Sequence, residues 1–140
     1  MGNMHAFTWD DLPRVLQWLG EVNALTHFHF PIHPGDFCHR LSNGLRGQHA
    51  EQYNFLYEQN GEFIALLFTE PNKEAFFEVL IHPQHRTAEL ESALIAWAEQ
   101  TQQAHFGTDA IEWVMDVASD DTLRQEILTQ RGYRMRLSPI

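Results

Sequence analysis

The chain has 140 residues, of which 44% are hydrophobic, and its ten Phe and four Trp residues supply bulky side chains for a core. This length and composition predict a single globular domain over residues 1–140 and exclude a disordered chain. The formal net charge is −10 and the nine Lys and Arg residues are scattered, which argues against nucleic-acid binding because no basic stripe can neutralise phosphates.

The cellular compartment is indicated by features that the sequence lacks. Cys38 is the only cysteine, so no disulfide can form within the chain and a reducing cytoplasm is expected. Because neighbouring residues on a helix do not face each other, His39 would not activate Cys38, and we expect a buried small side chain there. No apolar run approaches about 18 residues, and the first residues do not form a signal peptide, so no membrane association is expected.

The N-terminal part of the chain predicts a strand followed by a helix. Alternation over His5–Trp9 indicates the strand, and Thr8 is a suitable N-cap for the helix. Apolar residues then recur at helical spacing until about Asn23; they are Leu12, Val15, Leu16, Leu19 and Val22.

Three histidines lie close together within Thr26–Pro34. Imidazole is a common zinc ligand, so His27, His29 and His33 could form a metal site. The alternative is a loop whose apolar residues pack inward and whose histidines face solvent. No paired cysteines and no HExxH spacing accompany the histidines, so we expect structural or titrating side chains and assign no metal ligand.

A short helix and a hairpin are predicted in the middle of the chain. Gly35–Ser42 is expected to be helical, because Asp36 lies near its start and Asn43-Gly44 follows it. Gln52–Gln59 and Phe63–Thr69 alternate as strands, and the two residues Asn60-Gly61 between them are a strong hairpin signal.

The chain is organised around the stretch Phe76–Gln100. Phe76–Ile81 is a short run of β-branched and aromatic residues typical of a buried strand, and Pro83 ends it. An apolar face at helical spacing begins after Thr87. The turn around Arg86 therefore brings free backbone N–H groups to the positive end of a helix dipole, an arrangement that binds anions such as phosphate.

This strand, turn and helix resemble the cofactor-binding core of the GNAT superfamily, the acyl-CoA-dependent N-acyltransferases. The family pattern is an apolar strand, a Pro, and then Arg-Gly-x-Gly-x-Gly or -Ala opening a helix. Residues at matching positions are Pro83, Arg86, Leu90, Ala93, Leu94 and Ile95, whereas the glycine positions hold Thr87, Glu89 and Glu91. A missing Cβ lets pyrophosphate approach the backbone amides, so the replacements imply a weakened CoA site.

The resemblance implies an α+β domain with a central mixed, mostly antiparallel sheet flanked by about four helices, and acetyl-CoA as the cofactor. It implies cofactor contacts at Val79, Leu80, Ile81, Arg86, Thr87, Ala88 and Leu90. Glu78, in the central strand, is the candidate base that takes a proton from the amine. The family often has a Tyr that acts as an acid on its last helix, and Leu128 holds that position here; Asp121 stands where Asn is frequent.

The C-terminal part predicts one more strand, a helix and a closing strand. Ala110–Ala118 is the expected strand, packed beside the central one as a right-handed crossover requires. A helix capped by Asp121 follows and ends at Gly132, and Tyr133–Leu137 is expected to start the last strand. The closing hairpin of the GNAT pattern is therefore incomplete.

Three functions remain open from the sequence. The first is transfer of acetyl from acetyl-CoA to an amine, weakened or lost because the turn glycines and the helix tyrosine are replaced. The second is a non-catalytic GNAT-like domain that binds a small ligand, a second GNAT domain or another copy of itself, as in the degenerate N-terminal half of a tandem protein. The third is a histidine-based metal-binding protein. The negative net charge favours a cationic acceptor such as a polyamine or lysine.

Overall fold

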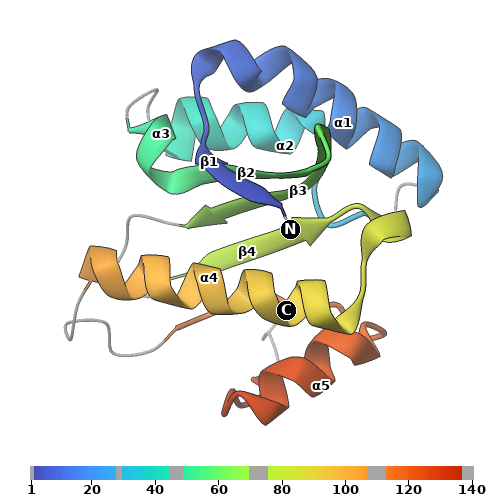
Figure 1. Ribbon diagram of the computed structural model, residues 1–140, viewed down its shortest axis with the longest axis vertical. Helices are drawn as coiled ribbons and strands as arrows, with labels where there is room; N and C mark the ends of the chain where they lie inside the picture. The colour runs from blue at the N-terminus through green and yellow to red at the C-terminus, as the bar shows by residue number, and fades with distance from the viewer. Residues whose placement is uncertain (1, 28–29, 45–48, 70–75, 107–112, 137–140) are drawn as a thin grey trace.

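A four-stranded antiparallel sheet lies between two layers of helices in the computed structural model (Figure 1). The structure describes residues 2–27, 30–44, 49–69, 76–106 and 113–136. The strands lie in sequence order across the sheet: β1 (Asn3–Ala6), β2 (Asn54–Gln59), β3 (Glu62–Thr69) and β4 (Phe77–Ile81). The predicted α+β class with a mostly antiparallel sheet is confirmed, and a parallel bridge joins Phe76 to Val114 beyond β4.

The helices are divided between the two faces of the sheet. α1 (Leu12–Leu25) and α2 (Pro34–His39) cover one face, and α4 (Ala88–Phe106) covers the other, with α5 (Thr122–Gln130) beside α4 (Figure 1). A π-helical turn, Arg40–Gly44, and the short α3 (Ala50–Tyr53) lead into β2. Among the described residues, no helix has the combined length and apolarity needed to cross a bilayer.

The predicted hairpin between β2 and β3 is confirmed. Gln59 pairs with Glu62, leaving a two-residue loop. Asn60 and Gly61 both have positive φ, 52° and 79°, and two consecutive positive φ angles match the twist of a tight antiparallel hairpin. The local pair Asn-Gly therefore sets the register that carries the apolar residues of β3 into the core.

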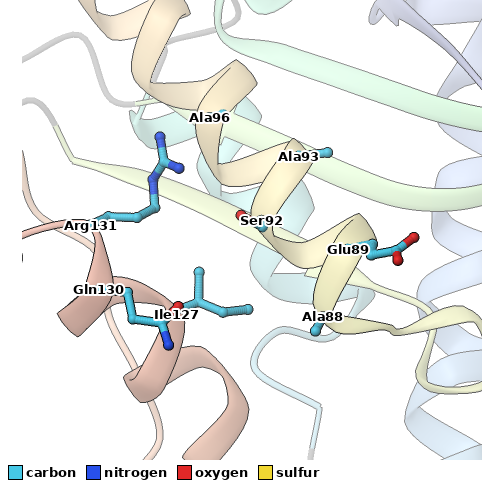
Figure 2. A pocket seen from close by; sticks show the side chains of 8 residues that line it. All are labelled: Ala88, Glu89, Ser92, Ala93, Ala96, Ile127, Gln130 and Arg131. Atoms are coloured by element: carbon cyan, nitrogen blue, oxygen red, sulfur yellow. The ribbon is translucent and has the colours of Figure 1, made fainter.

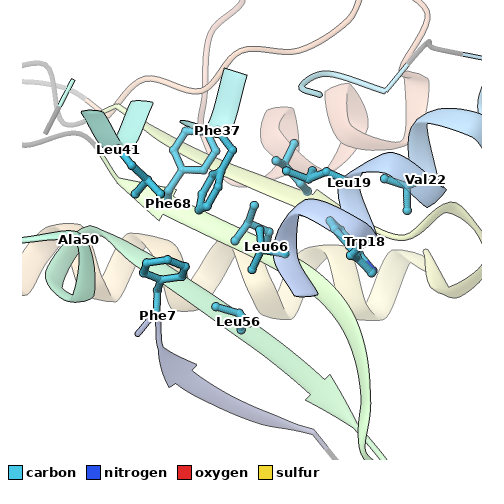
Figure 3. Close-up of a cluster of buried hydrophobic side chains, with 12 residues drawn as sticks. Phe7, Trp18, Leu19, Val22, Phe37, Leu41, Ala50, Leu56, Leu66 and Phe68 are labelled. Carbon is cyan, nitrogen blue, oxygen red and sulfur yellow. The ribbon is translucent and has the colours of Figure 1, made fainter. Parts of the chain in front are cut away.

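Each face of the sheet has its own hydrophobic cluster. On the α1 and α2 side, Trp18, Leu19 and Val22 of α1 meet Phe37, Leu41, Leu66 and Phe68 (Figure 3). On the α4 side, the cluster includes Ala65, Leu67, Val79, Leu94, Ile95, Ile127 and Leu128. The alternation of β3 and β4 between the two clusters follows the two-residue period of a strand.

Two predictions for the N-terminal part are wrong. The first strand ends at Ala6, because a helical turn begins at Trp9, where Asp11 accepts a hydrogen bond from the N–H of Thr8 at 2.9 Å. Cys38 is exposed rather than buried. The buried face of this segment passes through Phe37 and Leu41, four residues apart, and Cys38 lies off that face.

The two C-terminal strands also differ from the prediction. Positions 110–112 lie outside the described residues, and residues 113–118 contribute only the single bridge at Val114. Residues 133–136 form no strand, and position 137 is outside the described part. Tyr133 is instead held against the α4 side, because its hydroxyl donates to Glu99 at 2.9 Å and its ring contacts Phe77 edge-on.

Candidate functional site

The turn after β4 is built by its own side chains. Pro83–His85 forms one 3-10 turn, in which the ring of His82 accepts a hydrogen bond from the N–H of Gln84 at 3.1 Å. The hydroxyl of Thr87 accepts from the N–H of Leu90 at 3.1 Å and so caps the start of α4. The capping threonine therefore takes one of the backbone donors that the GNAT pattern would offer to phosphate.

Arg86 turns into the protein and pairs with two carboxylates. Its Nε donates to Glu91 at 2.6 Å, and its Nη2 donates to both oxygens of Asp121 at 2.8 and 2.9 Å. Burial alone lowers the pKa of Arg86, but the hydrogen bonds to Glu91 and Asp121 outweigh it and the pKa is raised. Arg86 is thus a permanent cation whose Nε and Nη2 donors are engaged by the chain's own acids.

Glu91 is shared between two arginines. Its side chain is fully buried, and its second oxygen accepts from Nε of Arg124 at 2.5 Å. Glu91 therefore points inward, away from the solvent side of the turn, whereas Glu89 is exposed. The sequence suggested that both glutamates would crowd or repel phosphates, and the structure gives Glu91 a different effect: it neutralises the guanidinium groups of the site.

Arg124 also reaches β4. Its Nη1 donates to Glu78 at 2.9 Å, and its Nη2 donates to the carbonyl oxygen of Val79. The N–H of Val79 in turn donates to the carboxylate of Glu78 at 3.1 Å. Both backbone polar groups of Val79 are therefore satisfied by side chains of this chain.

The backbone N–H and C=O groups of Val79 lie on the edge of β4 that faces away from β3. The N–H of His82 bonds to Ile64 in β3, whereas the N–H of Phe77 bonds to Val114 on the other side. Because hydrogen-bonding groups alternate between the two edges of a strand, Val79 and Ile81 also present their backbone groups away from β3. Arg124 thus lies along this outer edge of β4 at Val79, past the point where the edge is bridged to Val114.

Glu78 is the excess acid of this network. Two arginines, at positions 86 and 124, face three carboxylates, those of Glu78, Glu91 and Asp121. Burial raises the pKa of Glu78 to about 7, and the nearby Asp116 adds to the increase, while Arg124 opposes it. A carboxyl group with this pKa can hold or release a proton near neutral pH.

A cleft of about 420 Å³ opens beside this network. Its walls come from the outer edge of β4, the turn at Pro83 and Arg86, the segment 118–124 and the connection after α1. Thr26, Phe30 and Pro31 contribute from that connection. The cleft is therefore lined by four of the predicted cofactor residues, Val79, Leu80, Ile81 and Arg86, and by Arg124, which contacts the predicted base.

A second hollow lies on the outer side of α4. This open groove, of about 550 Å³, runs between the start of α4 and the end of α5 (Figure 2). Small side chains of α4, including Ala88 and Ser92, form one wall, and Ile127 and Gln130 of α5, together with Arg131 just after it, form the other. Glu89 points away from α5 in this view.

Comparisons with known proteins find similar proteins by structure but not by sequence. No protein-family profile matches the sequence, and no curated protein matches it. The ribosomal-protein-S18-alanine N-acetyltransferase of Escherichia coli superposes with a TM-score of 0.71 at 18% identity, over 98% of this chain and 80% of the other. The spermidine N-acetyltransferase of Vibrio cholerae, solved with CoA and spermine, gives 0.66 at 20% identity, over 94% and 79%.

The chain has the GNAT fold. A GCN5-related N-acetyltransferase of Sphaerobacter thermophilus also superposes, with a TM-score of 0.69 at 19% identity over 95% of this chain. Only 43% of that protein is covered, so this chain spans less than half of its length. At these identities the likeness concerns the fold, and the chemistry has to be argued from the residues of the site.

The residues around β4 do not fit acetyl-CoA as they stand. The GNAT pattern uses the backbone of the central strand and the amides of the Arg86 turn. Here Arg124 and Glu78 occupy the backbone groups of Val79, and Thr87 occupies the amide of Leu90. The guanidinium of Arg86 is engaged by Glu91 and Asp121.

The other predicted cofactor residues are dispersed by the fold. Ala88 lines the outer groove instead of the cleft. Leu90 is partly buried against the hydrophobic cluster on the α4 side. Leu80 belongs to the cluster on the α1 and α2 side, and it also borders the cleft. The predicted set is therefore gathered around the cleft only at Val79, Leu80, Ile81 and Arg86.

The histidine-rich segment does not form a cluster in the part of the chain that the structure describes. His27 has a positive φ of 52°, and His29 lies outside the described residues. The ring of His33 caps α2 by accepting from the N–H of Gly35 at 3.0 Å. No group of three or more potential metal ligands is found among the described residues.

Arg124 is the site residue that sequence reasoning did not identify. A signal for it exists, because Arg124 is three and four residues from the buried Ile127 and Leu128 and so shares their face of α5. An arginine inside an apolar stripe is rarely buried without a partner. That signal predicts a buried carboxylate, and the structure identifies Glu91 and Glu78 as the partners.

Proposed function

We propose that this chain is an N-acetyltransferase-like domain in which transfer of acetyl from acetyl-CoA to an amine is weakened. The observation that carries the proposal is the occupation of Val79 by Arg124 and Glu78, together with the pairing of Arg86 to Glu91 and Asp121. Acetyl transfer needs donors for the thioester oxygen and an anchor for the phosphates, and both groups are engaged by the chain itself.

The site retains a candidate base, Glu78, although its cofactor contacts are occupied. A base that accepts a proton from an ammonium group works best when its pKa lies near the working pH, and burial raises the pKa of Glu78 to about 7. The same carboxyl is hydrogen-bonded to Arg124 and to the backbone of Val79. Glu78 can therefore act as a base only when an amine approaches along the β4 edge that Arg124 now lines.

The ligand that this cleft favours is cationic. Asp120 and Asp121 line the cleft and the buried Glu78 lies behind it, against the two arginines 86 and 124, and the whole chain has a net charge of −10. An excess of acid attracts amines over long range. Among structurally similar proteins, one is a spermidine N-acetyltransferase in complex with CoA and spermine, which supports polyamines as the first acceptors to test.

The test measures binding and turnover of the unmodified chain. Thermal unfolding is followed with and without acetyl-CoA, and release of free CoA is followed with spermidine, spermine and lysine. A ligand at about 100 times its Kd stabilises a protein by about 2.7 kcal/mol, so tight binding is easily detected. We expect a small thermal shift and slow CoA release; rapid amine-dependent release would show that transfer is not weakened.

A non-catalytic binding domain is the second candidate, and the cleft favours it. The 420 Å³ volume is large enough for a small molecule, even if acetyl-CoA is excluded. This candidate expects stabilisation by a polyamine alone, with no release of CoA when acetyl-CoA is added.

A further inference from the structure

We propose that Arg124 determines the ligand specificity of the cleft by closing the open edge of β4 against the pantetheine arm of acyl-CoA. The inference rests on the proposed weakening of acetyl transfer and names the residue responsible for it. Arg124 would be an internal occupant of the cleft, and its removal would open the edge to an amide-bearing chain.

The position of Arg124 is fixed from both ends. Its backbone N–H donates to Oδ1 of Asp121 at 3.1 Å in the first turn of α5, and its side chain is 7% exposed. The guanidinium then contacts Glu91, Glu78 and the carbonyl of Val79. A planar guanidinium with this many partners is held in one orientation.

The chemistry of the blocked edge identifies what it would otherwise bind. Outward-facing N–H and C=O groups of a strand accept an extended chain that carries its own amides. The pantetheine arm of CoA is such a chain, since amide groups are spaced along it. Arg124 supplies a donor to the Val79 carbonyl and Glu78 supplies an acceptor to its N–H, so the pair substitutes for one amide of an incoming ligand.

A ligand cannot simply displace this arginine. If the guanidinium moved out, the fully buried Glu91 would keep only Arg86, and the buried Glu78 would lose its only ion pair among the described residues. Leaving buried carboxylates without a cation is strongly unfavourable. The closed edge is therefore maintained by the charges behind it as well as by the hydrogen bond to Val79.

The test variant removes the arginine together with its principal acid. Arg124→Ala/Glu91→Ala deletes one cation and one anion, so the net charge is unchanged, and the pairing of Arg86 with Asp121 can remain. Alanine is also a residue that the GNAT pattern allows at position 91. A second variant, Arg124→Lys, keeps a cation beside the carboxylates but loses the planar fork that reaches Val79.

The matched control acts on the same two helices outside the cleft. Arg131 of the α5 end donates through Nε to Glu99 of α4 at 3.2 Å. Arg131→Ala/Glu99→Ala therefore removes the same two residue types across the same helix pair. Neither residue borders the cleft beside β4.

Binding is measured by calorimetry with pantetheine, acetyl-CoA and pyrophosphate on each protein, after cooperative urea unfolding has shown that it is folded. We expect Arg124→Ala/Glu91→Ala to bind pantetheine and acetyl-CoA at least about tenfold more tightly than the unmodified chain, since a charge-assisted hydrogen bond is replaced by a ligand contact. Arg124→Lys should gain in the same direction, and the control should not. Pantetheine carries no phosphate, so its gain reports on the β4 edge alone.

The inference is overturned if the folded variants bind pantetheine no better than the unmodified chain, or if the control gains equally. If the double variant fails to fold, Arg124→Lys decides alone. Strong acetyl-CoA binding with rapid transfer by the unmodified chain would instead contradict the proposed function. The variants therefore test the role of Arg124, and the unmodified chain tests the proposed function.

Discussion

Oε1 of Glu91 accepts a hydrogen bond from Nε of Arg124 at 2.5 Å, although the two residues are 33 positions apart in the sequence. The other oxygen of Glu91 accepts from Arg86. The first turns of α4 and α5 are thus joined by a buried ionic bridge at the position where the GNAT pattern carries Gly or Ala. From the sequence, Glu91 was expected to weaken a phosphate site; in the structure it joins two helices by pairing with Arg86 and Arg124.

Replacing this glutamate should destabilise the domain strongly. Glu91→Ala leaves two arginines without their shared carboxylate, and breaking a buried pair from one side costs about 3–5 kcal/mol. Glu89→Ala is the matched control, because Glu89 is a glutamate two residues earlier, at another glycine position, and is exposed. It should change the free energy of unfolding by less than about 0.5 kcal/mol.

Urea unfolding of both variants and of Arg124→Ala/Glu91→Ala measures the effect. The double variant should lose less stability than the sum of the losses in Arg124→Ala and Glu91→Ala, because each single change strands one member of the Glu91–Arg124 pair, whereas the double change removes both members and leaves only Glu78 without its cation. Equal losses for Glu89→Ala and Glu91→Ala would show that the buried bridge contributes little.

The contribution of Glu78 to the stability of the domain should fall as pH rises through the range in which its carboxyl titrates. The pKa of Glu78 is about 7 in the folded chain against an ordinary value of 4.5, so the folded chain keeps a proton that the unfolded chain releases. Unfolding is therefore favoured progressively between about pH 4.5 and 7, by up to about 3 kcal/mol, and the effect levels off above the folded pKa.

Glu78→Gln isolates this contribution. The amide carries no titrating proton, so the difference in unfolding free energy between the two proteins should shift in favour of the variant as the pH rises through the same range. His82, Asp11 and Glu58, whose pKa values are lowered, titrate in both proteins and cancel in the difference. A difference that stays constant across this range would show that Glu78 is not the titrating group.

The fold was predictable where the signal is local. Asn60-Gly61 specified a hairpin, and the apolar run ending at Pro83 specified the central strand, because the backbone preferences of these residues act over a few positions. The strand expected from Tyr133 failed because a tertiary contact decides it: the Tyr133 hydroxyl binds Glu99 on α4. Propensity alone carries no information about that partner.

The site was predictable only in part, for the same reason. Arg86 and Glu78 were found from their positions beside a strand and a turn. Their actual partners were not, since Arg124 meets Glu78 across 46 residues and Glu91 across 33. The sequence places these charges on separate elements, and only the packing of α5 against α4 and β4 brings them together.

Arg40 should be another position where lysine cannot replace arginine. Its Nε donates to the side chain of Asn54 at 3.0 Å, and its Nη2 donates to the carbonyls of Tyr53 and Thr69 at 3.1 and 2.6 Å. The guanidinium also lies 4.1 Å from the ring centroid of Phe68. Lysine has one ammonium group and cannot make this set of directed bonds.

We expect Arg40→Lys to lower the free energy of unfolding by about 2–3 kcal/mol, because at least one buried acceptor loses its donor. Arg14→Lys is the control: Arg14 pairs with Glu58 at the surface and its side chain is 42% exposed, so the cost should stay below about 1 kcal/mol. Chemical denaturation measures both. Comparable losses in the two variants would show that the fork geometry of Arg40 is unimportant.

His33 should act as a helix cap rather than as a metal ligand. Its Nδ1 accepts from the N–H groups of Gly35 and Asp36 at 3.0 and 3.4 Å, and Asp36 accepts from the N–H of His33 at 2.9 Å. This reciprocal arrangement satisfies donors at the start of α2. His33→Asn should retain the cap, whereas His33→Ala should lose about 1 kcal/mol.

Zinc distinguishes the two roles of His33. If it is a cap, adding zinc leaves the difference between His33→Asn and His33→Ala unchanged, and the unmodified chain is not stabilised more than either variant. If the histidines of Thr26–Pro34 hold a metal, zinc stabilises the unmodified chain and both substitutions abolish that gain, since asparagine replaces the cap but not the imidazole ligand. Thermal unfolding with and without zinc measures these effects, and His27→Ala is tested in parallel. Loss of zinc stabilisation in both the His33 and the His27 variants would indicate a shared metal, whereas a cap at His33 predicts no zinc effect in either.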